Sequence, residues 1–181
     1  MSVGSKKIAF GGVITALGTV IIILSGIFQM AMFILPAVSG LLVLFSAFEV
    51  DYRFSMKIYF SISILSLILS PDKSSAILFI TFLGYYPLVK VKIEELMKKF
   101  KITKILLKLL LFNLVMFMYY FILVYVLATP RESFEIFGVY LPMAFLIVGN
   151  ITFLMYDRCI VYVFWIFVYK VRSKIPFKII E

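Results

Sequence analysis

The sequence predicts an all-α integral membrane protein, a six-transmembrane-helix bundle that forms a single transmembrane domain over residues 1–181. Of the 181 residues, 64% are hydrophobic and only 15% are charged. A water-soluble protein with so few polar side chains could not cover its surface with them, so we expect the surrounding solvent to be lipid. Short polar segments also interrupt the apolar stretches at a spacing that suits membrane-spanning helices.

The first two spans are predicted within one long uncharged stretch. No charged residue occurs from Ile8 through Phe48, and a single helix of that length would measure about 60 Å, roughly twice the hydrocarbon thickness of a bilayer. The stretch is therefore expected to cross the membrane twice, over about 8–28 and 30–48. Glycine and proline near the middle of the stretch relax helical geometry where the chain needs to turn.

Charged and turn-forming residues bound the remaining four spans, which are predicted at about 54–70, 75–89, 105–129 and 138–169. The turn at 71–74 separates the third span from the fourth, and Pro130 ends the fifth. Residues 88–103 place apolar side chains among lysines and glutamates at spacings that fit a cytoplasmic amphipathic linker. Two interpretations of this linker stay open, a solvated extension of the fourth span and a surface for a partner protein.

The net charge of +9 is distributed unevenly over this topology. Fifteen of the eighteen basic residues fall on one side of the predicted membrane, only Lys73 and Arg131 fall on the other, and Arg158 lies inside the last span. The positive-inside rule then places both chain ends and the linker in the cytoplasm. We interpret the basic charge as a topology signal and a grip on anionic membrane lipids, not as a nucleic-acid surface. The chain is therefore predicted to be a multi-pass protein of the cell membrane.

The scarcity of catalytic residue types argues against an enzyme. The chain has one cysteine, Cys159, and no histidine. An intramolecular disulfide and a cysteine-cluster metal site are thereby excluded, and zinc, haem and triad chemistry lose their usual ligand or base. An intramembrane aspartyl protease needs two carboxylates that share a proton, and Asp157 has no second carboxylate in a matching context. We predict no catalytic residue, no metal site and no cofactor.

Three small residues of the first span form a candidate docking face. Ala9, Gly12 and Ala16 recur at three- and four-residue spacing, which places them on one side of a helix. Small side chains let another helix approach closely, and such packing drives helix association in lipid. Packing within this bundle and docking onto a separate membrane subunit both fit the pattern.

Asp157 and Arg158 are a candidate intramembrane charge pair. They are adjacent opposite charges in an otherwise apolar stretch, and ionisable residues inside a membrane span are costly and often functional. A span over 140–160 would place the pair near the cytoplasmic face, whereas a span over 148–168 would place it near the middle of the membrane. We expect the two charges to compensate one another.

Uncharged polar residues of the last two spans are candidate substrate-binding groups. Asn113, Tyr120 and Asn150 are predicted to face a small cavity between these spans, where a ligand would be mainly apolar or aromatic. The alternative for the two asparagines is a hydrogen bond between neighbouring helices, a common structural role in membrane bundles.

Two stretches of sequence carry a family resemblance. The first span begins with Lys-Lys-Ile-Ala-Phe-Gly-Gly-Val-Ile-Thr-Ala-Leu from Lys6, and the second contains Leu-Pro-Ala-Val-Ser-Gly-Leu-Leu-Val from Leu35. With the six-span layout, these stretches resemble the substrate-binding S components of energy-coupling-factor (ECF) transporters. In that family an Ala-x-x-x-Ala-like ladder of the first helix contacts a transmembrane coupling subunit. Gly12 and Ala16 have the comparable spacing, with glycine in place of the first alanine.

The resemblance implies a membrane-embedded, substrate-binding subunit for uptake of a small molecule or vitamin. Such a subunit binds its substrate on the outer side and works with the transmembrane coupling subunit and with cytoplasmic ATPases. The alternative, from a different class, is a non-catalytic MreD-like membrane scaffold of an envelope or cell-shape complex. A tightly bound small molecule would distinguish the two.

Overall fold

Helices account for nearly all of the chain that the computed structural model describes, namely residues 3–28, 31–128, 135–136, 139–140 and 142–171. The predicted all-α class is confirmed. The helical elements are α1 (Val3–Ile27), α2 (Ile34–Glu49), α3 (Tyr52–Leu69), α4 (Lys73–Leu78), η2 (Phe79–Leu83), α5 (Tyr86–Leu96), α6 (Lys101–Tyr125), α7 (Pro142–Ile166) and η4 (Phe167–Val171). Two-residue strands, β1 (Glu135–Ile136) and β2 (Val139–Tyr140), pair antiparallel between α6 and α7.

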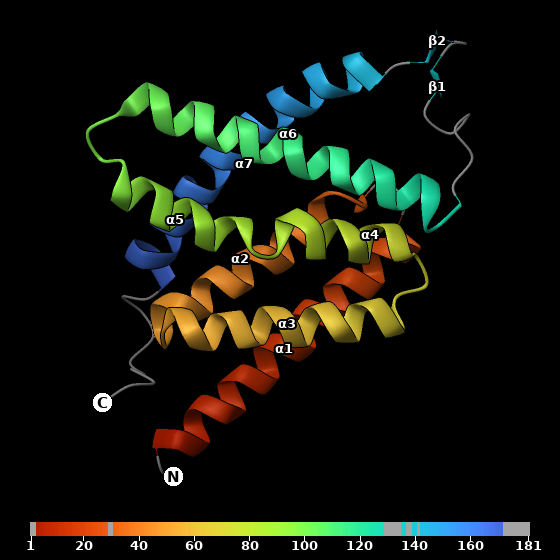
Figure 1. Ribbon diagram of the computed structural model, residues 1–181. Helices are drawn as coiled ribbons and strands as arrows, with labels where there is room; N and C mark the ends of the chain where they lie inside the picture. Colours follow the sequence, from red (N-terminus) through yellow and green to blue (C-terminus); the bar gives the residue numbers. More distant parts are fainter. Residues whose placement is uncertain (1–2, 29–30, 129–134, 137–138, 141, 172–181) are drawn as a thin grey trace.

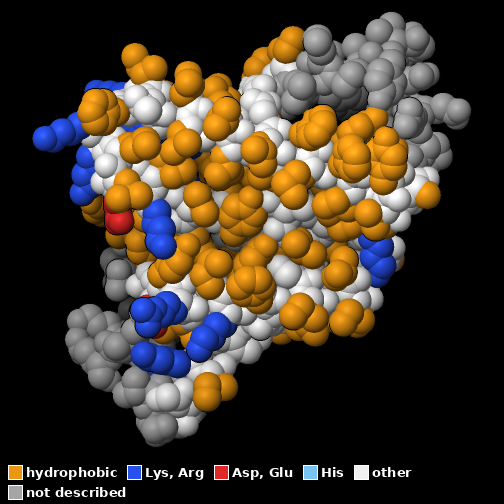
Figure 2. Space-filling model, in the orientation of Figure 1, with side chains coloured by type: hydrophobic (Ala, Val, Ile, Leu, Met, Phe, Trp, Pro, Cys, Tyr) orange, Lys and Arg blue, Asp and Glu red, His pale blue; other side chains and the backbone are white. Residues whose placement is uncertain are grey.

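Five helical stretches among the described residues are long and apolar enough to cross a membrane: Gly4–Ile27, Tyr52–Leu69, Lys73–Leu96, Lys101–Tyr125 and Ile147–Lys170. The remaining apolar helix, α2, has 16 residues, which is about 24 Å of helix against a hydrocarbon core of about 30 Å. Large apolar side chains are exposed over much of the surface (Figure 2). Such a surface suits lipid better than water, so these features are those of a multi-pass membrane protein.

α3, the stretch from α4 through α5, and α6 lie roughly side by side with alternating sense, whereas α1, α2 and α7 run obliquely to them (Figure 1). α1, α2 and α3 pack against one another, and the stretch from α4 through α5 packs against α2. α6 contacts η2 and α5 on the side away from α1, and α7 crosses behind α5 and α6 at a steep angle. The N-terminal end of α1 and the C-terminal end of η4 lie toward the same end of the bundle as the turn between α5 and α6 (Figure 1).

Acidic side chains cap the N-terminal ends of α3 and α4. The carboxylate of Asp51 accepts a hydrogen bond from the Phe54 amide at 2.6 Å. At the opposite end of α3, the carboxylate of Asp72 accepts bonds from the amides of Ser74 and Ser75 at 3.0 and 3.1 Å. The first amides of a helix have no partner within the helix, so these caps satisfy groups that lipid could not.

Small residues allow close contact among the first three helices. A Cβ added at Gly18 would lie 2.5 Å from Cδ1 of Ile62 and 3.0 Å from Oγ of Ser39. The Ser39 hydroxyl donates to the Gly18 carbonyl at 3.2 Å, which joins α1 to α2. The hydroxyl oxygens of Ser46 and Ser55 lie 2.7 Å apart and join α2 to α3. Tight packing and interhelical hydrogen bonds of this kind hold helices together in lipid.

A π-helical turn, η2, lies in the middle of the fourth helical stretch and faces a glycine of α2. A Cβ added at Gly40 would lie 2.0 Å from the carbonyl oxygen of Leu83, so this backbone contact requires glycine. A π-turn shifts the register of helical hydrogen bonds. The carbonyl of Ile80, which lies within this turn, accepts a hydrogen bond from the Tyr59 hydroxyl of α3 at 2.6 Å. The close approach therefore fixes the position of η2 and of α5, which follows it.

The segment 88–103, expected to be an amphipathic linker, consists of the second part of α5, a turn at 97–100 and the start of α6. Leu88, Lys90 and Ile93 are buried, because α5 packs against α2 and α6. The fourth helical stretch thus continues to Leu96, beyond the expected end of the span, and its extension is packed into the bundle. The use of its exposed side as a partner surface stays a prediction.

Candidate functional site

Five polar side chains from three helices meet inside the bundle and form what we term the charge cluster. Tyr86, Lys90 and Glu94 follow one another at four-residue spacing on one face of α5, Lys108 comes from α6, and Asp157 comes from α7. Only 2% of Lys90 and 4% of Lys108 is exposed. Two lysines so deeply buried need carboxylate partners, because an unpaired buried charge is costly.

Asp157 is the centre of the charge cluster. Its Oδ1 lies 2.6 Å from Nζ of Lys90 and 3.1 Å from Nζ of Lys108, and its Oδ2 lies 3.2 Å from Nζ of Lys108. The Tyr86 hydroxyl also donates to Oδ1 at 2.5 Å, and the Lys90 ammonium donates to the main-chain carbonyl of Asp157. Through these bonds one residue of α7 is attached to both α5 and α6.

Glu94 completes the charge cluster on its more open side. Its Oε1 lies 2.7 Å from Nζ of Lys108 and 3.5 Å from Nζ of Lys90. The Glu94 side chain is 39% exposed, compared with 14% for Asp157. The two ammonium groups and two carboxylates cancel in formal charge, so the cluster as a whole is neutral and its burial is tolerated.

The charge cluster lies near the basic end of the bundle. Lys108 follows the start of α6 by seven residues and Lys90 precedes the end of α5 by six, so about 10 Å of helix separates each from the turn at 97–100. Exposed lysines follow at this turn, including Lys98, Lys99 and Lys101. Figure 2 shows most visible basic side chains gathered toward this end.

Aromatic rings enclose the inner side of the charge cluster. Phe82 stacks on Tyr86 with ring centroids 4.6 Å apart, and Phe112 stacks on Phe153 at 4.7 Å. The ring of Tyr156 lies 6.0 Å from that of Tyr86, and its buried hydroxyl has no hydrogen-bond partner among the described residues. These rings keep water away and lower the local dielectric constant, which strengthens the ion pairs.

The structure differs from the sequence-based pairing of Asp157 with Arg158. Asp157 pairs with Lys90 and Lys108, and Arg158 is exposed on the outside of α7. Successive residues of a helix point about 100° apart, so both cannot face α5 and α6. Sequence reasoning missed the two lysines because it assigned them to the cytoplasmic segment. Lys108 nevertheless falls inside the predicted fifth span, and a lysine within a span indicates a buried partner.

The candidate substrate-binding residues divide between a pair and a separate tyrosine. Nδ2 of Asn150 donates to Oδ1 of Asn113 at 3.1 Å and joins α7 to α6, while Nδ2 of Asn113 donates to the Leu109 carbonyl at 2.9 Å. Oδ1 of Asn150 is buried without a partner among the described residues. Tyr120 is half-buried on α6. The hydrogen bond between α6 and α7 is the structural role that was considered for the asparagines. Oδ1 of Asn150 can still accept a hydrogen bond.

The small-residue face of α1 lies on the outside of the bundle. Ala9, Gly12 and Ala16 are all exposed, and nothing lies within 4 Å of a Cβ added at Gly12. At Gly11, by contrast, an added Cβ would lie 2.7 Å from the ring of Phe54. Of the two interpretations given to this face, packing within the bundle is not what the structure shows.

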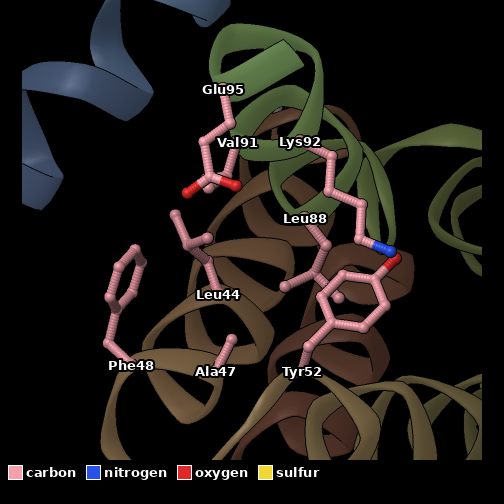
Figure 3. A pocket seen from close by; sticks show the side chains of 8 residues that line it. All are labelled: Leu44, Ala47, Phe48, Tyr52, Leu88, Val91, Lys92 and Glu95. Atoms are coloured by element: carbon pink, nitrogen blue, oxygen red, sulfur yellow. The ribbon is translucent and has the colours of Figure 1, made fainter.

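A separate hollow of about 210 Å³ lies between α2 and α5. Its lining is mainly aliphatic and aromatic, and its polar members include Tyr52, Lys92 and Glu95 (Figure 3). The Lys92 ammonium lies 3.8 Å from the centroid of the Tyr52 ring, a cation–π contact. None of the predicted substrate-binding residues lines this hollow. The described residues contain no group of three or more side chains of the types that would hold a metal ion.

Comparison with protein-family models, with curated proteins and with solved structures finds no match for this chain. The likeness to S components therefore rests on the two stretches of the first and second spans. Any functional proposal accordingly depends on those stretches together with the geometry described above.

Proposed function

We propose that the chain is the membrane-embedded, substrate-binding subunit of an ECF-type transporter for uptake of a small molecule or vitamin. The observation that carries this proposal is the exposure of Ala9, Gly12 and Ala16 on the outside of α1. In the family that the sequence resembles, the corresponding face contacts a transmembrane coupling subunit. Such a subunit would in turn connect this chain to cytoplasmic ATPases.

The packing of α1 supports a docking role for this face. Gly11 and Gly18 allow close contacts of α1 within the bundle, with Phe54 and Ile62. The bundle itself therefore does not require a small residue at Gly12. A stripe of small residues that faces outward lets a helix of another subunit approach closely, and close packing is the main source of helix association in lipid.

The arrangement proposed in the membrane has six spans, with the short helix α2 as the second and with both chain ends in the cytoplasm. The N-terminal end of α1 and the C-terminal end of η4 lie toward the same end of the bundle (Figure 1), which supports an even number of crossings. The exposed lysines at the turn between α5 and α6 support a cytoplasmic location for that end. Residues 172–181, which include several of the expected cytoplasmic charges, lie outside the described residues.

The substrate proposed for this subunit is a small apolar or aromatic molecule bound among the helices. Asn113 and Asn150 support a location between α6 and α7, because Oδ1 of Asn150 is buried and has no partner among the described residues. A buried acceptor without a partner favours a ligand that donates a hydrogen bond. Nearby aromatic rings of α6 and α7, such as Phe112 and Phe153, would suit the apolar part of that ligand.

The proposed topology predicts opposite labelling at the two ends of the bundle. In a Cys159→Ser background, Lys98→Cys is expected to be shielded from an impermeant thiol reagent in intact cells, whereas Pro71→Cys is expected to react. Both positions are exposed in the structure, so permeabilised cells should label both and serve as the control. Labelling of Lys98→Cys from outside intact cells would contradict the proposed topology.

The docking role predicts that bulk on the outer face of α1 separates partners without unfolding the chain. The double variant Gly12→Leu, Ala16→Leu should keep the thermal stability of the wild type, because both positions are exposed, yet it should lose its copurifying coupling subunit and its uptake activity. Ser61→Leu, at an exposed position on α3, is the matched control and should keep both. The measurements are pull-down from gentle detergent and thermal unfolding of the isolated protein.

Two outcomes would remove this proposal. A double variant that keeps its membrane partner shows that the face is not used, and one that unfolds alone shows that the face packs within the bundle.

Native mass spectrometry of the wild-type complex addresses the substrate, since an uptake subunit should retain a small molecule. Copurification with envelope proteins and no small molecule would favour the MreD-like scaffold.

A further inference from the structure

The outer side of α7 carries a hollow of about 350 Å³ that plays no part in the charge cluster. Among the described residues it is lined by Arg158, Val161, Tyr162, Trp165 and Ile166, which all belong to α7. The lining combines a cation, two rings with polar edges and two aliphatic side chains. Because these side chains are exposed on a helix apolar enough to span the membrane, the hollow faces lipid.

The Arg158 guanidinium has no carboxylate partner among the described residues that line the hollow. The carboxylates of the charge cluster, Asp157 and Glu94, are both used by Lys90 and Lys108. Within the described parts of the chain, Arg158 forms no ion pair. A guanidinium next to lipid requires an anion or water, so its partner is expected from outside the chain.

The height of Arg158 in the bundle indicates which anion is available. Asp157, its neighbour, is level with Lys90 and Lys108, and about 10 Å of helix separates these lysines from the basic turn at 97–100. Long basic side chains extend from such a depth to the headgroup region. Tyr162 and Trp165 continue from Arg158 along the same helix, and tyrosine and tryptophan favour the same interfacial zone.

We propose that Arg158, Tyr162 and Trp165 form a binding site for the phosphate of an anionic phospholipid from the leaflet at the basic end of the bundle. The planar guanidinium donates two parallel hydrogen bonds to phosphate oxygens. The Tyr162 hydroxyl and the Trp165 ring nitrogen are further donors, and the aliphatic lining suits the start of an acyl chain. The surplus of lysines at this end attracts anionic lipid in preference to neutral lipid.

Trp165 makes the site directly observable, because it is the only tryptophan of the chain. The protein is placed in phosphatidylcholine nanodiscs that contain a minor fraction of either brominated phosphatidylglycerol or brominated phosphatidylcholine with the same acyl chains. Bromine quenches tryptophan fluorescence on contact, so the two titrations compare anionic with neutral lipid at the hollow. We expect stronger quenching by the anionic lipid in the wild type and weaker preference at high salt.

Removing the guanidinium is expected to reduce that preference. Arg158→Gln should lower the relative affinity for the anionic lipid about fivefold, since one basic group near the surface contributes about that factor. Arg158→Lys, which keeps the charge and lacks the planar fork, should retain part of the preference. Arg53→Gln removes an exposed arginine from the start of α3 and is the matched control, with no change expected.

Two results would overturn the lipid site. The first is equal quenching by the two brominated lipids in the folded wild type. The second is a preference for anionic lipid that Arg158→Gln leaves unchanged while its thermal unfolding matches that of the wild type. If the lipids quench equally and a second membrane protein copurifies with the wild type but not with Arg158→Gln, Arg158 belongs to a protein interface. If Arg158→Gln does not fold, the preference of Arg158→Lys for anionic lipid is compared with that of the wild type. A reduced preference supports the lipid site, and an unchanged preference overturns it.

Discussion

Replacement of Asp157 with asparagine is expected to destabilise the folded protein by about 3 to 5 kcal/mol, the usual result of removing one partner from a buried ionic group. The variant would leave Lys90 and Lys108, which are 2% and 4% exposed, with only the half-exposed Glu94 between them. An amide can accept a hydrogen bond from one lysine, but it supplies no negative charge. We therefore expect α7 to separate from α5 and α6 before the other helices do.

The loss is measured as a change in thermal or denaturant unfolding of purified protein in one fixed detergent. Glu95→Gln is the matched control, because it removes a carboxylate of α5 that is exposed and has little effect on stability when lost. The control should stay within about 1 kcal/mol of the wild type. A similar small effect for Asp157→Asn would show that the charge cluster is open to water.

Removing one lysine together with Asp157 is expected to recover part of the stability. Asp157→Asn combined with Lys108→Met leaves Lys90 and Glu94 with opposite charges, so the interior is neutral again. The double-mutant cycle should give a coupling free energy of about 1 to 3 kcal/mol, as for other residues in one ion-pair network. The cycle of Asp157→Asn with Arg158→Gln should give almost none, because these neighbours do not pair. The opposite order of couplings would contradict the charge cluster.

Gly40→Ala is expected to have the second large effect, a destabilisation of about 3 kcal/mol or more, toward the upper end of overpacking costs. The added Cβ would lie 2.0 Å from the Leu83 carbonyl oxygen. Because that atom belongs to the backbone of η2, no side-chain rotation relieves the overlap. α2 and η2 must move apart, and the displacement reaches Tyr86 and Lys90 of α5, the next helix along the chain.

Gly12→Ala is the matched control for Gly40→Ala, since both add one methyl group to a glycine within a helix. Nothing lies within 4 Å of the Cβ added at Gly12, so this variant should be neutral or more stable by up to about 1 kcal/mol through helix propensity. The two unfolding midpoints are compared in the same detergent. Equal stability of Gly40→Ala and the wild type would show that α2 and η2 are further apart than the structure places them.

Local sequence was sufficient to predict the solvent of each segment and the class of fold. The uncharged stretch from Ile8 to Phe48 indicates lipid because length and polarity alone decide whether a helix can remain in a bilayer. The break between α3 and α4 was also predictable, because Pro71 and its polar neighbours favour a turn. Lys73 and Ser74, which were expected within the turn, begin α4 because Asp72 caps that helix. The six-span count and the orientation in the membrane stay predictions that labelling tests.

Tertiary structure decided which faces and charges meet. Helical periodicity places Gly12 and Gly18 on different sides of α1, but only the packing of α2 and α3 shows that the Gly18 side is inside. The choice of Lys90 and Lys108 as partners of Asp157 likewise depends on how α7 packs against α5 and α6, which are distant from it along the chain. Adjacent charges such as Asp157 and Arg158 look paired in sequence, yet a helix turns them about 100° apart. Asp157 lies beside two buried lysines of α5 and α6, so its ion pairs depend on how α5, α6 and α7 pack together.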